Sequence, residues 1–368
     1  MLEVAKEAYA LYQSENALGP AAFPSLKRME TEVIAMAIDL LNGPVEGTGN
    51  ITSGGTESII LAVKTCRDEA ASRGVDVIGA NLVLPRTAHL AFDKAAHYLG
   101  LEIRRVDVDD DFLADPAAMA EAMDDRTLMI MGSAPCFPYG LVDPIPALSD
   151  LALERNVWLH VDACVGGYLN PFAEREGVEL PAWDFRVEGV RTISADLHKY
   201  GYAAKGASTI LHRSAEQHAH QTFSNSDWPA GAMTTPTVAG TRPGGAIASA
   251  WAVMNYLGVD GYREKHRQVT EAREAIETGV RQLGFEILGK PLLGIVAFSH
   301  PELNVFAIYK QMYGKGWFTS LTTSPRALHL MLSPFHREVT DTYLADLEAS
   351  IAAVRAGDTD AVTEARYS

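Results

Sequence analysis

Cysteine is scarce in this sequence, which also lacks long hydrophobic runs and an excess of positive charge. The three cysteines, Cys66, Cys136 and Cys164, do not have metal-ligand spacing, and such a sparse, odd set is typical of reduced thiols in a cytoplasmic protein. A formal net charge of −16 argues against a surface for nucleic acid or anionic membranes, although an acidic shell can still contain a local basic pocket. We therefore expect a cytoplasmic protein without a metal site or a nucleic-acid partner.

The longest apolar stretch, residues 31–41, contains two acidic residues and is far shorter than the roughly 20 residues of a membrane-spanning helix. Three charged residues among the first seven interrupt any signal-peptide pattern. Because hydrophobic residues make up 47% of the 368 residues, the chain can form the core of one large domain and a smaller one. We expect no membrane span.

Helical and strand-like segments alternate from about residue 58 to residue 211. This alternation indicates βαβ units and a mostly parallel sheet, and the nearly continuous apolar character of the strands fits a sheet covered on both faces. The predicted strands are 81–84, 102–106, 127–131, 157–161, 191–195 and 208–211, and the predicted helices are 58–71, 90–99, 116–123 and 145–155.

The pattern changes after residue 211. Residues 224–245 are rich in Gly, Pro, Thr and Ser, and we interpret them as a long functional loop. Further helices are predicted at 246–256, 261–283, 303–312 and 339–354, and further strands at 285–288, 295–298 and 327–332. The sequence thus predicts an α/β protein with an N-terminal helical segment (1–45), a large domain (46–258) and a small C-terminal α+β domain (259–368).

A pair of glycines precedes a predicted helix in Ser53-Gly54-Gly55-Thr56. Glycine lets the backbone approach a ligand, and the N–H groups at the start of a helix point at an anion, to which Thr56 adds a hydroxyl donor. A tight turn with an N-cap explains the same residues, so this motif alone is a weak indication of a phosphate site.

Asp162 ends an apolar strand, and open α/β sheets bind ligands outside the carboxyl ends of their strands. A carboxylate at this place can hold a protonated pyridine nitrogen, whose charge in turn stabilises the ionised carboxylate. A helix N-cap or a buried ion pair is the alternative explanation. His160 lies on the same face of the strand by the two-residue period, and we expect it to be structural.

Lys199 follows the apolar stretch 190–195 in the run Asp196-Leu197-His198-Lys199-Tyr200-Gly201. Most lysines are solvated and carry no chemistry, but partial desolvation makes an amine a nucleophile. His198 can donate to a phosphate. A phosphate cradle, then Asp162, then Lys199 is the chain order that a pyridoxal 5'-phosphate site requires, so the sequence predicts this cofactor with covalent attachment at Lys199.

Three further residues are candidates with open alternatives. His89 follows a predicted strand, where its imidazole can stack on the cofactor ring or simply be a satisfied loop residue. Lys205 and Arg242 can bind an anionic substrate. Both are equally well explained as surface cations, and Arg242 also as an interface ion pair.

Five segments together resemble the sphingosine-1-phosphate lyase family, which lies within the wider group of pyridoxal-phosphate-dependent amino-acid decarboxylases. The resemblance extends over about residues 23–354, and the set is highly specific. Lysine followed by Tyr-Gly, with a later Lys-Gly, is typical of the lyases. The segments that carry the resemblance are 52–58, 137–140, 160–167, 194–202 and 240–245.

The resemblance implies a role for each matching residue. It places the cofactor phosphate on Gly55, Thr56 and His198, ring stacking on His89, the ring nitrogen on Asp162, covalent attachment on Lys199 and the substrate phosphate on Lys205. The implied fold is the aspartate-aminotransferase-like class, fold type I, whose members are homodimers with active sites at the subunit interface. Thr241 and Arg242 are therefore expected to serve the site of the neighbouring subunit.

The chain departs from the family pattern at three positions. Leu197 stands where the family usually has Thr, Ala204 where it has Pro, and Tyr139 where it has His. We expect Tyr139 to touch the active site as a substrate-binding residue. Most relatives have a further segment before the position of Met1, so part of the dimer contact or of the substrate entrance is expected to lie outside this sequence.

The resemblance implies a carbon–carbon lyase that performs a retro-aldol cleavage of a phosphorylated amino alcohol, similar to a sphingoid-base phosphate, to an aldehyde and phosphoethanolamine. Lys199 is the candidate proton carrier, and Tyr202 is a weaker one. The alternative is a pyridoxal-phosphate-dependent amino-acid decarboxylase, which differs in whether a phosphate or a carboxylate of the substrate is bound. A third hypothesis is a cofactor-binding scaffold without activity.

Overall fold

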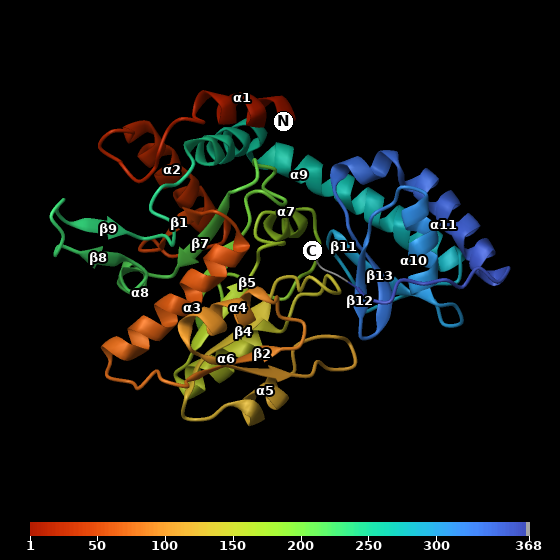
Figure 1. Cartoon of the computed structure of the whole chain (residues 1–368), viewed down its shortest axis with the longest axis horizontal. Coiled ribbons are helices and arrows are strands. Elements are labelled where there is room, and N and C mark those ends of the chain that lie inside the picture. Colours follow the sequence, from red (N-terminus) through yellow and green to blue (C-terminus); the bar gives the residue numbers. More distant parts are fainter. Residues whose placement is uncertain (366–368) are drawn as a thin grey trace. The chain divides into compact units, whose positions relative to one another are not determined.

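A seven-stranded sheet forms the centre of the larger of two units, in the strand order β1-β7-β6-β5-β4-β2-β3 (Figure 1). In the computed structural model, which describes residues 1–365, strands β6, β5, β4, β2 and β3 are parallel, and β7 is antiparallel to both β1 and β6. The predicted mostly parallel sheet is therefore confirmed. The strands are β1 (Thr48–Thr52), β2 (Asn81–Pro85), β3 (Glu102–Val106), β4 (Thr127–Ser133), β5 (Trp158–Asp162), β6 (Val190–Ala195) and β7 (Ser208–His212).

Helices cover both faces of this sheet because its inner strands are apolar on both sides. Within β2, Leu82 and Leu84 belong to a buried cluster with residues of α3 and α4, whereas Val83 belongs to a second cluster with residues of α5 and α6. The helices of this part of the chain are α1 (Leu2–Leu11), α2 (Pro24–Leu40), α3 (Gly55–Ser72), α4 (Ala91–Leu99), α5 (Pro116–Ala122), α6 (Ile145–Arg155), α7 (Asn170–Arg175) and α8 (Ala215–Ala219).

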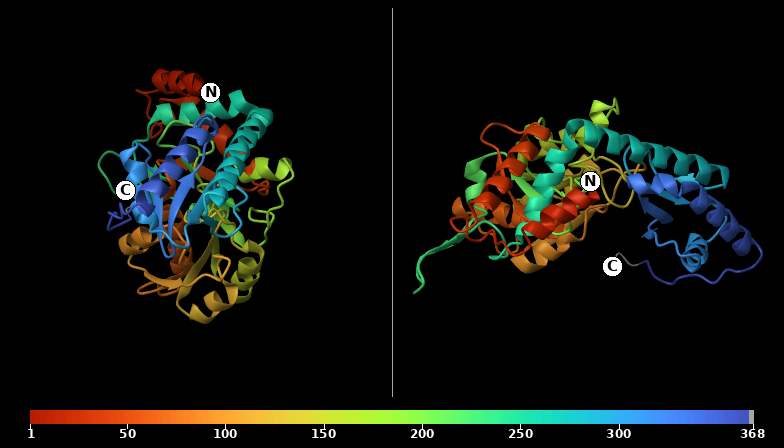
Figure 2. Two further views of the ribbon diagram at one scale, coloured as in Figure 1. Left: turned by 90° about the vertical axis from the view of Figure 1, so that its right-hand side faces the viewer. Right: turned by 90° about the horizontal axis from the view of Figure 1, so that it is seen from above.

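The segment predicted as a long loop contains a short hairpin, formed by β8 (Phe223–Asn225) and β9 (Met233–Thr235). Figure 2 (right) shows this hairpin extending away from the rest of the larger unit. The interpretation as loop throughout was therefore wrong, because strands of three residues are too short to give a recognisable alternation. Helix α9 (Gly244–Gln282) follows and is interrupted at Gly258, whose φ of 53° lies in the region that favours glycine.

The smaller unit is built around a four-stranded antiparallel sheet in the order β10-β11-β13-β12. One buried cluster joins this sheet to the two long helices that follow its strands in the chain. Strand β12 was not predicted from the sequence. The elements are β10 (Glu286–Ile287), β11 (Ile295–Ser299), α10 (Val305–Gly314), β12 (Ser320–Thr323), β13 (Arg326–Met331), the 3-10 helix η1 (Pro334–Glu338) and α11 (Thr340–Arg355).

The chain passes between the two units more than once. The larger unit comprises residues 1–109, 113–136 and 142–262, and the smaller unit comprises residues 110–112, 137–141 and the chain from residue 263 onward. The predicted domain division at residues 45 and 258 stays a prediction, because compactness does not show which segments fold independently. Among the described residues, no helix has both the length and the apolar character to cross a membrane.

Candidate active site

The carboxyl ends of β4, β5 and β6 place polar residues side by side, with Ser133 opposite Asp162 and Asp162 opposite Ser194. Asp162 is 8% exposed. Its Oδ1 accepts hydrogen bonds from the N–H of Cys164 at 3.0 Å and from the Ser194 hydroxyl at 3.3 Å. These two donors fix the carboxylate, while Oδ2 keeps its capacity to accept a further proton donor.

The start of α3 lies against the same edge of the sheet, and the packing there requires glycine. A Cβ at Gly55 would lie 2.7 Å from Cys164 Sγ and 3.0 Å from each carboxylate oxygen of Asp196. Gly55 and Thr56 are the first residues of α3, so their N–H groups have no partner within the helix and can bind an anion. The predicted cradle therefore meets the strand ends, as a phosphate site requires.

Lys199 lies in the turn after β6 and forms an ion pair that the sequence analysis did not assign. Its Nζ is 2.9 Å from Oδ2 of Asp196. Burial lowers the pKa of Lys199, but Asp196, Cys164 and Asp162 outweigh it, so the net shift of this pKa is upward. The expectation that desolvation makes Lys199 lose its proton more readily is corrected, because the neighbouring negative charge stabilises the ammonium form.

His198 connects the cradle to the lysines. A Cβ at Gly54 would lie 3.6 Å from its Cε1, and its Nδ1 accepts a hydrogen bond from the N–H of Ala207 at 3.2 Å. Burial lowers the pKa of His198. A neutral ring whose Nδ1 accepts must carry its proton on Nε2, the atom 3.5 Å from Asp196, so this contact is not an ion pair between two full charges. Lys205 Nζ donates to the carbonyl of His198 at 2.9 Å.

His89 is half-buried between β2 and α4, where its Nδ1 accepts a hydrogen bond from the N–H of Ala91 at 3.0 Å. Burial lowers the pKa of His89. The charge of Asp162 raises this pKa and the charge of Lys199 lowers it, so His89 lies within electrostatic reach of both residues. An uncharged imidazole at this place is suited to lie against a cationic ring, because it adds no second positive charge.

Arg242 is occupied within its own chain. Its guanidinium forms two hydrogen bonds with Glu30, at 2.6 and 3.0 Å, and donates to the carbonyl of Ile51 at 3.2 Å. This pair fastens the Gly/Pro-rich segment to α2 and β1. Thr241 is exposed and its hydroxyl accepts from Asn16 at 3.4 Å. Of the alternatives left open by the sequence, an ion pair is therefore present within one chain, and a role toward substrate stays a prediction.

The two remaining candidate tyrosines have different surroundings. Tyr202 has a φ of 58°, and its hydroxyl is buried without a hydrogen-bond partner among residues 1–365. Burial raises its pKa, so the phenol keeps its proton at neutral pH. Tyr139 belongs to the smaller unit, is 5% exposed and donates to the carbonyl of Ser324 at 2.7 Å. Contact of Tyr139 with the site stays a prediction.

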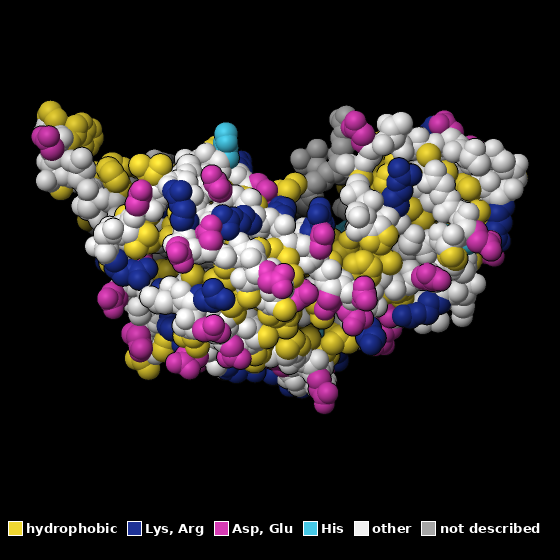
Figure 3. All heavy atoms as spheres, turned by 90° about the horizontal axis from the view of Figure 1, so that it is seen from below, with side chains coloured by type: hydrophobic (Ala, Val, Ile, Leu, Met, Phe, Trp, Pro, Cys, Tyr) yellow, Lys and Arg dark blue, Asp and Glu magenta, His cyan; other side chains and the backbone are white. Residues whose placement is uncertain are grey.

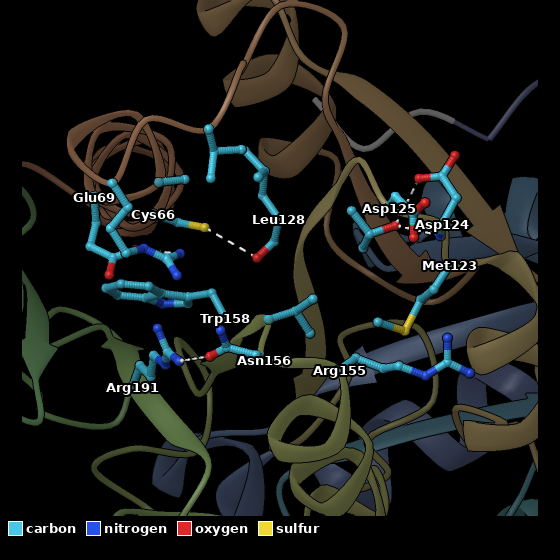
Figure 4. Close-up of a pocket in the computed structure, with 15 residues that line it drawn as sticks. Cys66, Glu69, Met123, Asp124, Asp125, Leu128, Arg155, Asn156, Trp158 and Arg191 are labelled. Carbon is cyan, nitrogen blue, oxygen red and sulfur yellow. Dashed lines mark hydrogen bonds and ion pairs between the residues drawn. The ribbon is translucent and has the colours of Figure 1, made fainter.

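A cavity of about 320 Å³ lies elsewhere, near the residues that begin β4, β5 and β6 (Figure 4). Figure 4 shows Trp158 and Arg191 on one side of it and Asp124 and Asp125 on another. None of the residues that the sequence assigns to the cofactor lines it. We therefore place the candidate active site at the opposite, carboxyl ends of these strands.

The residues at the carboxyl ends fit pyridoxal 5'-phosphate. The N–H groups at the start of α3 and the Nε2–H of a neutral His198 would hold its phosphate. Asp162 would hold the ring nitrogen through the oxygen that no described residue occupies, and Lys199 supplies the amine. Asp196 was missed as a site residue, although its place three residues before Lys199 is a signal for an ion pair.

Comparison with known proteins identifies the family of the chain. The family model described as the pyridoxal-dependent decarboxylase conserved domain matches residues 7–300. A curated sphingosine-1-phosphate lyase of Oryza sativa subsp. japonica is 39% identical over 356 residues, which cover 95% of this chain. The chain spans 66% of the length of that relative. The resemblance to this group that the motifs predicted is therefore confirmed.

Two further relatives extend the comparison. The structure of a sphingosine-1-phosphate lyase from Burkholderia pseudomallei K96243 is similar, with a TM-score of 0.91 and 36% identity over 96% of this chain and 84% of that chain. A probable L-tyrosine/L-aspartate decarboxylase of Methanothrix thermoacetophila is 34% identical over 96% of this chain and 89% of that protein. The chain belongs to the pyridoxal-dependent decarboxylase family, and the cofactor predicted from its sequence is the one that this family uses.

Proposed function

We propose that this chain is a pyridoxal-phosphate-dependent carbon–carbon lyase that cleaves a phosphorylated amino alcohol to an aldehyde and phosphoethanolamine. The observation that carries the proposal is a second lysine near the first. Lys205 Nζ donates to the carbonyl of His198, the residue before Lys199, and burial and the charge of Lys199 both lower the pKa of Lys205. A second cation within electrostatic reach of the reactive amine is suited to a substrate that carries its own phosphate. The similarity to proteins named sphingosine-1-phosphate lyase supports the same substrate class.

The bound cofactor supplies an aldehyde that holds the substrate amine and a ring that accepts the electron pair of the cleaved bond. Asp162, whose orientation is fixed by Cys164 and Ser194, would keep the ring nitrogen protonated. His89 would lie against one face of the ring. Lys199 would be the base or acid that moves a proton near the cleaved bond, and the buried hydroxyl of Tyr202 would be a second, weaker proton carrier.

Amino-acid decarboxylation is the alternative, and the Methanothrix relative supports it. It requires the same lysine and the same Asp162, so the residues that hold the cofactor do not separate the two reactions. The two reactions differ in the anionic group of the substrate that the protein must bind, a phosphate or a carboxylate. Lys205, Arg242 and Tyr139 are the candidates for binding it. Incubation of the holoenzyme with a phosphorylated amino alcohol and with a panel of amino acids tests this directly, since a lyase releases aldehyde and a decarboxylase releases carbon dioxide.

Lys205→Ala is expected to lower kcat/KM for the phosphorylated substrate by about ten- to a hundredfold, because a charge-assisted hydrogen bond contributes roughly 1.5–3 kcal/mol. The visible absorbance of the bound cofactor should be retained, since Lys205 is assigned to the substrate. The preference for phosphorylated over unphosphorylated amino alcohol should narrow by the same factor. Steady-state kinetics with both substrates measures this effect.

Lys94→Ala is the matched control for this experiment. Lys94 lies on α4, where its ammonium group makes a cation–π contact with the ring of Tyr98. Its removal should leave kcat/KM at the wild-type value for both the phosphorylated and the unphosphorylated substrate. Release of the cofactor from Lys205→Ala, or an unchanged preference, would show that Lys205 does not hold the substrate phosphate, and decarboxylation would then become the better proposal.

We further propose a cytoplasmic homodimer with shared active sites. The hairpin β8–β9 and the segment after it expose large apolar side chains: Phe223 is 53% exposed, Trp228 61% and Val238 64%. Figure 3 shows hydrophobic side chains on the projecting hairpin (upper left). A second copy that covers them would remove apolar area from water, and Thr241, which is exposed next to this segment, would then face the neighbour's site. The sparse, odd set of cysteines supports the cytoplasmic location.

The double substitution Trp228→Lys and Val238→Lys is expected to convert the dimer to monomers, because it places two charges in the proposed apolar contact. Sedimentation velocity on the purified protein measures the change. Ile78→Lys is the control, since Ile78 is 79% exposed on the same unit and belongs to neither the hairpin nor the segment after it. If the hairpin variant sediments like the wild type, this surface is not the dimer contact.

A further inference from the structure

Asp196 is a buried carboxylate for which the proposed reaction has no role. It is 2% exposed and lies in the turn between β6 and Lys199. Its Oδ2 pairs with Lys199 Nζ at 2.9 Å, whereas its Oδ1 has no hydrogen-bond partner among residues 1–365. A Cβ at Gly55 would lie 3.0 Å from each of these oxygens, so the carboxylate lies directly against the start of α3.

A carboxylate in this environment depends on its neighbours for its stability. An unpaired buried charge is costly, and a buried ion pair offsets that cost only through close contact. Lys199 provides such a contact at one oxygen. The start of α3 provides the positive end of a helix dipole beside both oxygens. The buried carboxylate of Asp196 is therefore most stable when Lys199 is in its protonated, positively charged form.

We propose that Asp196 is a positioning residue that holds Lys199 as an ammonium ion at the start of α3 in the cofactor-free protein, and that this ion pair controls the pH at which the cofactor attaches. This inference depends on the assignment of the cofactor and not on the lyase reaction. It can therefore fail while the proposed function stands, and the reverse is also true.

The chemistry of attachment explains why the ion pair matters. Lys199 must first release one proton to solvent, because only the neutral amine has the lone pair that attacks the aldehyde carbon. A carbon–nitrogen double bond then forms, and the carbonyl oxygen leaves as water. A partner that stabilises the ammonium form lowers the fraction of neutral amine at a given pH, and the attachment rate falls in proportion.

Several other charged or titratable groups face Lys199. Among residues 1–365, Asp196 is the ion-pair partner of Lys199. Asp162 and Cys164 also raise the pKa of Lys199, and Lys199 in turn lowers the pKa of His89 and of Lys205. His198 is its neighbour in the chain, and burial lowers the pKa of this imidazole, which leaves it neutral. Asp196 is thus the group whose removal should change the titration of Lys199 most.

The test compares cofactor attachment in the wild type and in Asp196→Asn, which keeps the shape of the side chain and removes its charge. Apoprotein is mixed rapidly with pyridoxal 5'-phosphate, and the second-order rate constant is followed by visible absorbance from pH 6 to pH 10. We expect the variant to attach the cofactor about tenfold faster or more near pH 8, since one pKa unit changes the fraction of neutral amine tenfold. Pyridoxal without the phosphate should show the same ratio.

Asp93→Asn is the control, because it removes a negative charge that pairs with Arg105 in the same unit. Its attachment profile should match that of the wild type. Equal profiles for Asp196→Asn and the wild type would overturn the proposal, since a residue that only fills space would give that result. A faster rate with pyridoxal phosphate alone would also overturn it, because Asp196 would then act by repelling the phosphate.

A second measurement decides the question if Asp196→Asn does not fold. Wild-type apoprotein labelled with 13C at lysine Cε gives one NMR signal for Lys199, which is assigned by its absence in Lys199→Ala. We expect this signal to titrate at a higher pH than those of the exposed lysines. Titration of Lys199 together with them, or at lower pH, would exclude an ion pair that holds the ammonium form.

Discussion

Lys199→Ala is expected to lower turnover by about 10⁴-fold or more, because loss of a residue that bonds covalently in the reaction removes a whole catalytic step and not a single contact. The protein should also lose the visible absorbance of the attached cofactor. Borohydride reduction of the wild-type holoenzyme, followed by peptide mass analysis, should find the cofactor on the peptide with Lys199. Reduction of the variant should label no peptide of the candidate site.

The same variant has a second expected effect, on stability. Removing Lys199 leaves the carboxylate of Asp196 buried with an unpartnered oxygen and no cation. Loss of one member of a buried pair costs roughly 3–5 kcal/mol, so thermal unfolding of the apoprotein should occur at a lower temperature. The double variant Lys199→Ala/Asp196→Asn should recover most of this lost stability, because the unpaired buried charge is removed.

Two results would reject the assignment of Lys199 as the attachment residue. One is cofactor found on Lys205 or Lys94 after borohydride reduction, and the other is turnover of Lys199→Ala within tenfold of wild type.

Much of the fold follows from local patterns that the sequence displays. The strand ending at Asp162 is mostly apolar and buried on both faces, so its position and its polar end can be recognised. The strand ending at Ala195 is almost as deeply buried, but it contains Arg191, Thr192 and Ser194. Ligands of open α/β sheets bind at the carboxyl ends of parallel strands, and this rule predicts that Asp162 and Lys199 lie close together. Gly55 is also explained by this edge, since Cys164 and Asp196 occupy the space of its absent side chain.

What the sequence did not predict depends on contacts between distant residues or on a balance of opposed effects. The partner of Arg242 is Glu30, 212 positions away, and no local pattern links them. The direction of the pKa shift of Lys199 is set by a competition, in which burial lowers this pKa and the acidic neighbours raise it more. A sequence shows that Asp196 lies three residues before Lys199, but it does not show whether the charge of Asp196 outweighs the effect of burial on the lysine.

Asp162→Asn is expected to reduce turnover by about a hundredfold or more while the protein retains its fold and its cofactor. The carboxylate favours the protonated ring nitrogen, and a positive ring accepts the electron pair of the cleaved bond far better than a neutral one. An amide keeps the shape and can accept the bond from Cys164, but it has no charge to hold the proton. The start of α3 and Lys199, which would hold the phosphate and the aldehyde carbon of the cofactor, are unchanged in this variant, so binding should suffer less than turnover.

The decisive measurement is therefore the pair of values, turnover and cofactor content, in one preparation of Asp162→Asn. Asp184→Asn is the matched control, because Asp184 is another fully buried carboxylate of the same unit, paired with Arg186 and bonded to Asn42. It should lose stability through its broken ion pair and keep its turnover per bound cofactor. If Asp162→Asn turns over at a near-normal rate, the ring nitrogen does not depend on this carboxylate. If it loses the cofactor in proportion to its activity, Asp162 is needed for binding and not specifically for the transfer of charge in the reaction.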